Sequence, residues 1–161
     1  MESVTANTDG SMPDSIHLFR HVRRVPWGDT DAAGTLYFAH IGRYCMEAIE
    51  LWYLERVGFD WYRMNVELRI GTPCVRADIE FRSPATPRDT LSIEVSVQRV
   101  GRSSAVFRVI GCAQETGRCC WEGRFTCVFI DAGSHSAVPV PDLFRSALER
   151  DAALAGHPQS D

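Results

Sequence analysis

The sequence predicts an α+β fold in which a curved antiparallel sheet of about five strands wraps one long, largely apolar helix. One sign is the helical spacing of apolar residues over 39–57, which leaves only a narrow polar stripe. Another is the run of strand-like segments that follows, separated by short turns typical of antiparallel hairpins. A helix this apolar must be covered by other elements, so we expect it along the concave face of the sheet.

Composition and charge limit the class of protein. The chain has 161 residues, of which 45% are hydrophobic, and contains no repeat or linker, so we expect one domain over 15–155 between tails at 1–14 and 156–161. A net charge of −4 argues against a nucleic-acid partner. The first residues lack the apolar core of a signal peptide, and no apolar run is long enough to cross a membrane. We therefore expect a cytoplasmic protein with no membrane partner.

The six cysteines do not indicate a metal or disulfide framework. None of them forms a CxxC pair or a His/Cys spacing suited to zinc. Most fall at apolar positions of predicted elements, so we interpret them as small buried hydrophobic residues. No metal or cofactor is expected.

A strand, a loop and the long helix are predicted in the first part of the chain. Residues 15–25 predict a first strand, which Pro26 ends. A loop with two aspartates and two glycines spans 27–38 and leads directly into the helix over 39–57. Gly58 is a suitable residue to stop that helix, and 60–65 is expected to be irregular.

Four strands and a closing helix are predicted after that. The first strand covers 67–81 with a break near 71–73, where Pro73 interrupts the pattern, and it carries Val75, Ala77, Ile79 and Phe81 on one face. The others cover 90–99, 103–114 and 119–131, and we expect all four to form an antiparallel meander. Residues 141–154 predict a short helix. Such a sheet has free edges, which pairing with a second copy would cover.

The loop carries a recognisable motif. Gly28-Asp29-Thr30-Asp31-Ala32-Ala33-Gly34-Thr35-Leu36-Tyr37-Phe38 resembles the Gly-Asp-x-Asp-x-x-Gly-hydrophobic signature of the 4-hydroxybenzoyl-CoA thioesterase family. The resemblance covers about residues 17–131. It implies the hotdog fold, hydrolysis of an acyl-CoA thioester, and a homodimer or homotetramer with sites between subunits.

The resemblance also implies roles for individual residues. Asp31 matches the family's catalytic carboxylate, and the backbone N–H of Phe38 matches the group that polarises the thioester carbonyl. The implied substrate-binding residues are Gly34, Tyr37, Thr72, Arg102 and Ser103. Many relatives have Tyr or His where this chain has Phe38, so only a backbone role transfers to that position.

The residues themselves explain why this loop suits thioester hydrolysis. The first turn of a helix offers free N–H groups and a partial positive charge, which would stabilise a developing oxyanion. Asp31 would act as general base on water or as nucleophile, and the sequence leaves both open. On spacing alone, a helix-capping role for Asp31 is about as probable as a catalytic one.

Three neighbouring polar residues receive structural interpretations. Asp29 is expected in a turn or cap, because aspartate bonds nearby backbone N–H groups. His40 is expected simply to occupy the first helical turn. Glu47 lies four residues after Arg43, so we expect a surface ion pair between them and not a catalytic glutamate.

Several functions are compatible with the sequence. The aromatic residues near the loop, together with the family analogy, favour a bulky or aromatic acyl group. A thioesterase acting on acyl-carrier protein and a non-catalytic acyl-binding hotdog protein are the alternatives. A hotdog hydratase would require a histidine pattern that the sequence lacks.

Overall fold

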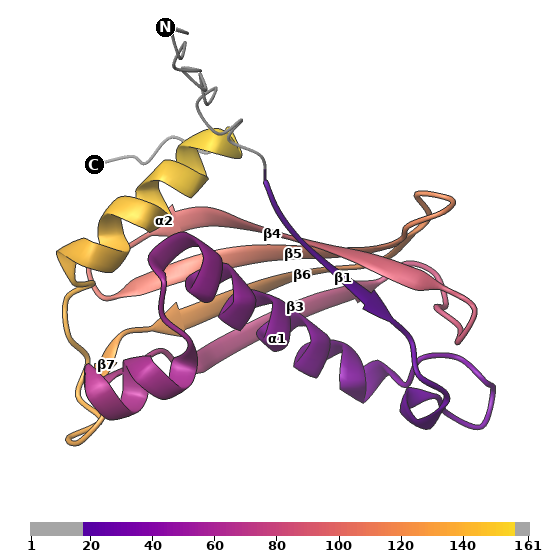
Figure 1. The fold of residues 1–161 in the computed structure, drawn as a ribbon, viewed down its shortest axis with the longest axis horizontal. Coiled ribbons are helices and arrows are strands. Elements are labelled where there is room, and N and C mark those ends of the chain that lie inside the picture. The colour runs from indigo at the N-terminus through magenta and orange to yellow at the C-terminus, as the bar shows by residue number, and fades with distance from the viewer. Residues whose placement is uncertain (1–17, 157–161) are drawn as a thin grey trace, which may run out of the picture.

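The computed structural model describes residues 18–156 and shows a five-stranded antiparallel sheet with a long helix across its concave face (Figure 1). The predicted tail at 1–14, the start of the predicted first strand and residues 157–161 lie outside the described part. The elements are β1 (Phe19–Arg24), η1 (Trp27–Asp29), α1 (Phe38–Val57), η2 (Arg63–Glu67), β2 (Ile70–Gly71), β3 (Cys74–Phe81), β4 (Thr90–Val100), β5 (Ser104–Ala113), β6 (Cys119–Val128), β7 (Ile130–Asp131) and α2 (Asp142–Leu154).

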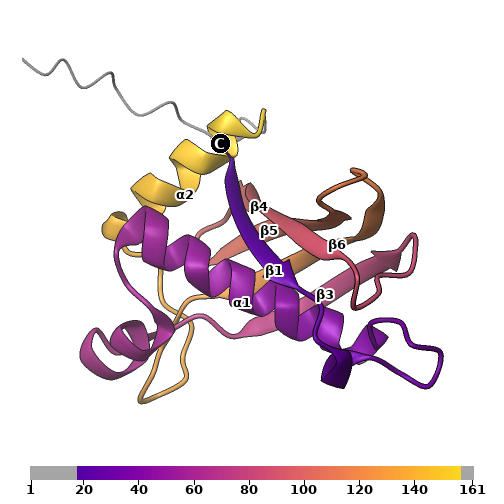
Figure 2. The same cartoon turned by 45° about the vertical axis from the view of Figure 1, so that its right-hand side comes forward.

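The long helix forms as predicted. Gly58 ends α1 in the left-handed region with φ of 85°, where the missing Cβ removes the steric cost. The buried face of α1 includes Tyr44, Trp52 and Tyr53, which are fully buried. Trp52 and Tyr53 pack edge-on against Phe107 of β5, with ring centroids 5.4 and 5.7 Å away. Two views of the ribbon show α1 running obliquely under the sheet (Figures 1 and 2).

The strand order differs from the predicted four-strand meander. The order is β1-β4-β5-β6-β3, so only β4, β5 and β6 follow one another as neighbours. β3 crosses to the far side and pairs with β6, while β1 pairs with β4. The two edges of the sheet are therefore β1 and β3.

The apolar row predicted on β3 is present but open to solvent. Val75 is 60% exposed and Phe81 is 52% exposed. The reason is position, because an edge strand has a neighbour on one side only. β3 therefore offers both unpaired backbone groups and apolar side chains to a partner.

Two further segments differ from the prediction. The piece expected to be irregular ends in a single π-helical turn, η2. The predicted strand over 119–131 is divided, because β6 ends at Val128 and β7 then pairs with β2 in a separate two-stranded sheet.

α2 closes one end of the sheet and is fixed by a buried carboxylate. Asp151 is 2% exposed and accepts hydrogen bonds from Trp52 Nε1 at 3.0 Å and from the Val97 N–H at 2.8 Å. Burial raises the pKa of Asp151, and the two donors oppose that shift. The contacts link α2 to both α1 and β4.

The cysteines follow the prediction in part. Cys45, Cys120 and Cys127 are buried, whereas Cys74, Cys112 and Cys119 are half-buried, and all six are free thiols. Burial raises the pKa of Cys45 to about 12, which suppresses its thiolate. Within residues 18–156, no helix combines the length and hydropathy needed to cross a membrane.

Candidate active site

The loop between β1 and α1 folds back on itself through its own backbone. The Asp31 N–H donates to Thr35 O at 2.9 Å, and the Gly34 N–H donates to Asp31 O at 3.0 Å. Gly34 has φ of 74°, a conformation that explains the glycine in this turn. The Tyr37 N–H donates to Asp29 O at 2.9 Å, which brings the two ends of the loop together.

Asp31 and the start of α1 line the same cavity. The cavity has a volume of about 340 Å³, and Asp31, Thr35 and Phe38 are among its lining residues. One carboxylate oxygen of Asp31, Oδ1, accepts the Ala33 N–H at 2.9 Å, which fixes the side chain in the loop. Asp31 is exposed, so its carboxylate is open to a ligand.

The N-terminus of α1 is uncapped at this cavity. Within the described residues, no side chain forms a capping hydrogen bond at Tyr37, the residue before the helix. The amide of Phe38 belongs to the first helical turn, whose N–H groups have no intrahelical acceptor. The Phe38 ring packs edge-on against Phe81 of β3, with centroids 6.1 Å apart. The cavity therefore combines a carboxylate with the positive end of a helix.

The opposite wall comes mainly from residues 81–85 and 120–121, which lie outside the loop motif. The Arg82 N–H and the Ser83 N–H both donate to Cys120 O, at 2.8 and 3.2 Å. The Leu36 N–H donates to Ala85 O at 2.8 Å and joins the loop to this wall. The remaining lining residues are Leu36, Ile41, Phe81, Arg82, Ser83, Pro84, Ala85, Cys120 and Trp121. Phe81 and the residues after it meet Cys120 and Trp121 only because β3 pairs with β6, which no local pattern indicates.

Asp29 has a different environment from Asp31. Its carboxylate is 15% exposed and accepts hydrogen bonds from Arg43 Nη2 and from the Tyr44 hydroxyl, each at 2.6 Å. The hydrogen bond from Tyr44 lowers the pKa of Asp29, and the charges of Arg43 and His40 add to this effect while burial opposes it. His40 Nδ1 faces Asp29 O at 3.3 Å. Asp29 thus ties the loop to α1 through side chains of the helix, and not through the nearby backbone N–H groups expected of a turn or cap.

This network predicts a pH dependence of stability. A lowered carboxyl pKa stabilises the fold above the ordinary value near 3.8, and this stability is lost as pH falls through the lowered value. Tyr44→Phe removes the main cause, so the pKa of Asp29 should move back toward its ordinary value and the stability difference from wild type should narrow as pH falls through that value. The substitution should also cost about 1 kcal/mol at neutral pH. Melting temperatures between pH 3 and 7 measure both effects, with the exposed Tyr62→Phe as control. Parallel curves for Tyr44→Phe and wild type would contradict the assignment.

The expected ion pair between Arg43 and Glu47 is wrong. Arg43 turns toward Asp29, and Glu47 instead binds the guanidinium of Arg23 from β1. His21 Nε2 also approaches Glu47 at 3.4 Å. The physical reason is that β1 supplies a cation directly above Glu47, and the Arg23 guanidinium stacks 4.0 Å from the centre of the Tyr44 ring.

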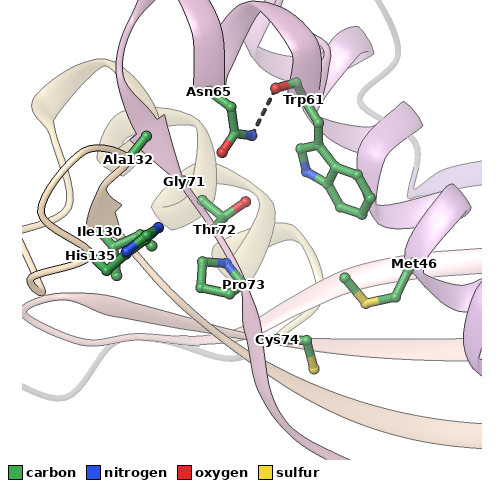
Figure 3. Close-up of a pocket in the computed structure, with 10 residues that line it drawn as sticks. All are labelled: Met46, Trp61, Asn65, Gly71, Thr72, Pro73, Cys74, Ile130, Ala132 and His135. Carbon is green, nitrogen blue, oxygen red and sulfur yellow. Dashed lines mark hydrogen bonds between the residues drawn. The ribbon is translucent and has the colours of Figure 1, made fainter.

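The substrate-binding residues implied by the resemblance lie in two separate parts of the structure. Gly34 and Tyr37 lie on the loop itself, where the Gly34 N–H donates to the Asp31 carbonyl, but neither is among the residues that line the Asp31 cavity. Thr72 instead lines a second cavity of about 410 Å³, together with Met46, Trp61, Asn65, Gly71, Pro73, Cys74, Ile130, Ala132 and His135 (Figure 3). The two cavities have no lining residue in common.

Arg102 and Ser103 lie at the same end of the sheet as Thr72. Ser103 O accepts the Phe129 N–H at 2.8 Å, and Arg102 O accepts the Val140 N–H at 2.8 Å. This turn joins β4 to β5 and adjoins α2, whereas Asp31 lies beyond the other end of β4. Within one chain, the expected catalytic residues therefore lie at the opposite end of the sheet from Thr72, Arg102 and Ser103.

Comparisons with known proteins agree with this architecture. Residues 25–148 match the family described as the thioesterase-like superfamily. A 1,4-dihydroxy-2-naphthoyl-CoA hydrolase from Nostoc punctiforme is 31% identical over 131 residues, which cover 81% of this chain and 86% of that protein. A protein of the same name from Picosynechococcus sp. is 35% identical over 77 residues, or 48% of this chain. In that case the chain spans about half of the relative's length, 52%.

A solved structure provides the matching fold. The crystal structure of a thioesterase-superfamily protein from Jannaschia sp. CCS1 is 39% identical and has a TM-score of 0.79, covering 86% of this chain and 94% of that one. The long helix and the five-stranded antiparallel sheet confirm the predicted fold class. The chain therefore has the hotdog fold and belongs to the thioesterase-like superfamily.

Proposed function

We propose that the protein is an acyl-CoA thioesterase that hydrolyses its substrate to a free acid and CoA at the Asp31 cavity. The observation that carries the proposal is the shared cavity of the Asp31 carboxylate and the uncapped start of α1 at Phe38. The loop motif supports a place in the 4-hydroxybenzoyl-CoA thioesterase family. We also propose that the enzyme acts in the cytoplasm. The names of the two naphthoyl-CoA hydrolases support an aromatic acyl group.

The chemistry needs few groups. The thioester carbonyl oxygen would lie at the Phe38 N–H, where the helix dipole stabilises the oxyanion. Asp31 would either take a proton from the attacking water or attack the carbonyl itself, giving an anhydride that water then opens. In both routes the C–S bond breaks, and CoA leaves as a thiolate that takes up a proton. A thiolate is a good leaving group, so no strong general acid is required.

The separation of the site residues favours a dimer. β3 is an exposed edge strand that connects the two cavities, because Cys74 lines the Thr72 cavity and Phe81 lines the Asp31 cavity. Antiparallel pairing of two β3 strands about their midpoints would place Cys74 opposite the partner subunit's Phe81. Each Asp31 cavity would then adjoin the Thr72 cavity of the other copy. We propose a homodimer of this kind, alone or within a homotetramer.

In this dimer the remaining residues take substrate-binding roles. The Thr72 cavity would hold the acyl group, and Arg102 with Ser103 would meet the phosphates of CoA. Gly34 and Tyr37 would shape the loop at the thioester. An exposed guanidinium suits phosphate, because it offers paired N–H donors together with a fixed charge.

The activity is tested by measuring thiol release from a panel of aromatic and aliphatic acyl-CoA substrates. We expect turnover of aromatic thioesters, and comparison with acyl-carrier-protein thioesters separates the alternative substrate class. Binding of acyl-CoA without thiol release would indicate the non-catalytic alternative. Failure of every thioester to bind or react would contradict the proposal.

A shared site predicts complementation between two inactive variants. Asp31→Asn removes the carboxylate, and Met46→Trp is designed to fill the Thr72 cavity. In a mixed dimer, one site combines the intact Asp31 of one chain with the intact cavity of the other. Random mixing makes about half of all dimers mixed, so refolding the two variants together should restore about a quarter of wild-type activity. Absence of any recovery in dimers shown to be mixed would place each complete site within one chain.

A further inference from the structure

The Thr72 cavity is unusual in having no acidic side chain, lysine or arginine in its lining. Its walls are largely apolar, with Met46 from α1, Trp61 after α1 and Pro73 before β3 (Figure 3). Its volume of about 410 Å³ lies within the range of small-molecule sites. The lining has one imidazole, that of the exposed His135, so a charged group entering this space gains at most that one partner for the water it loses, and the lining favours an uncharged occupant.

One wall of this cavity carries a hydrogen-bond donor without a partner. The Trp61 Nε1 atom is buried and has no hydrogen-bond acceptor among the described residues. Figure 3 shows the indole nitrogen on the side of the ring that faces Thr72. A buried N–H without an acceptor costs roughly 1–3 kcal/mol, so an occupant with an acceptor would recover that energy.

The position of this donor is fixed by the backbone of Trp61. Its N–H donates to Glu50 Oε1 at 3.3 Å, and its carbonyl accepts a hydrogen bond from Asn65 Nδ2 at 2.8 Å. The ring also packs against the hydrophobic core. The Thr72 residue across the cavity is 6% exposed and adds a hydroxyl that can donate or accept.

We infer that Trp61 is a specificity-determining residue, whose indole N–H selects acyl groups that carry an uncharged oxygen acceptor. This inference rests on the proposed function, because it assigns the Thr72 cavity to the acyl group. The oxygen, a ring hydroxyl or carbonyl, accepts from Trp61 Nε1, and a hydroxyl can also donate to Thr72. An acyl group without the oxygen leaves the buried donor unsatisfied and is hydrolysed less efficiently.

The kinetic test compares benzoyl-CoA with its 2-, 3- and 4-hydroxy derivatives in wild type and Trp61→Phe. Wild type should prefer at least one hydroxybenzoyl-CoA by about tenfold in kcat/KM, the value of one hydrogen bond. Trp61→Phe should lose this preference, so that its kcat/KM values for benzoyl-CoA and for the hydroxy derivatives become similar. Trp27→Phe, at a 74% exposed tryptophan outside both cavities, should keep the preference. An equal loss of kcat/KM for benzoyl-CoA and for the preferred hydroxy derivative would mean that Trp61 contributes only apolar contact. That result would overturn the inference.

A second measurement does not depend on turnover. The indole N–H resonance of Trp61, assigned by its disappearance in Trp61→Phe, should move downfield when wild type is titrated with p-cresol. Toluene, which lacks the oxygen, should leave it nearly unchanged. The absence of a p-cresol shift would overturn the inference even for an active thioesterase. A shift in a protein that hydrolyses no thioester would support the binding role of Trp61 and contradict the proposed activity.

Discussion

Asp31→Asn is expected to lower kcat for thioester hydrolysis by about 10³-fold while leaving stability within about 0.5 kcal/mol of wild type. Asparagine retains an oxygen that can accept the Ala33 N–H, which Asp31 Oδ1 accepts at 2.9 Å, so the loop should keep its shape. What is lost is the negative charge that, in the proposed mechanism, activates water or attacks the carbonyl. Release of the CoA thiol and thermal unfolding measure the two quantities.

The matched control is Asp142→Asn at the exposed start of α2, which should retain full activity. Binding of substrate should also survive in Asp31→Asn, because the proposed acyl and phosphate contacts lie on other residues. Full activity of Asp31→Asn would remove Asp31 from the mechanism. A large loss of stability would instead show that its role is to hold the loop.

Asp151→Ala is expected to lower the free energy of unfolding by about 3 kcal/mol at neutral pH. The substitution leaves two buried donors without acceptors, the Trp52 indole N–H and the Val97 N–H, each costing roughly 1–3 kcal/mol. Because burial raises the pKa of Asp151, its contribution falls as pH rises from the ordinary carboxyl value through the raised one. The difference between variant and wild type should therefore narrow with rising pH.

Denaturant unfolding of Asp151→Ala between pH 4 and 8 measures this effect. Glu149→Ala on the same helix should cost less than about 0.5 kcal/mol, since its ion pair with Arg145 is on the surface. Activity of folded Asp151→Ala should be close to wild type, because α2 lies away from Asp31. A destabilisation no larger than that of Glu149→Ala would show that the two donors find water instead.

The elements of this fold could be predicted because each has its own period. In α1 the apolar residues recur at helical spacing, and Gly58 follows the last of them. In β4 and β5 every second residue is apolar. The observed boundaries of these elements therefore agree with the predicted ones to within a few residues. The proximity of Asp31 to the start of α1 was also predictable, since Phe38 is only the seventh residue after Asp31.

What the sequence could not provide are contacts between distant segments. The alternation on β3 predicts a strand but not that it lies at the edge beside β6. An Arg43–Glu47 ion pair was expected from helical spacing, yet Arg43 pairs with Asp29 from the loop and Glu47 pairs with Arg23 from β1. Trp61 gave no signal, because an unpaired indole N–H is a property of its surroundings and not of the local sequence.

The edge position of β3 has a consequence for substrate length in the proposed dimer. The strand rises about 3.3 Å per residue, and side chains keep their faces only when the pairing shifts by two residues. One such shift between two β3 strands would move the Thr72 cavity by about 7 Å relative to the partner's Asp31. The register of a single strand would therefore determine how far the acyl group extends beyond the thioester, independently of the residues that line either cavity.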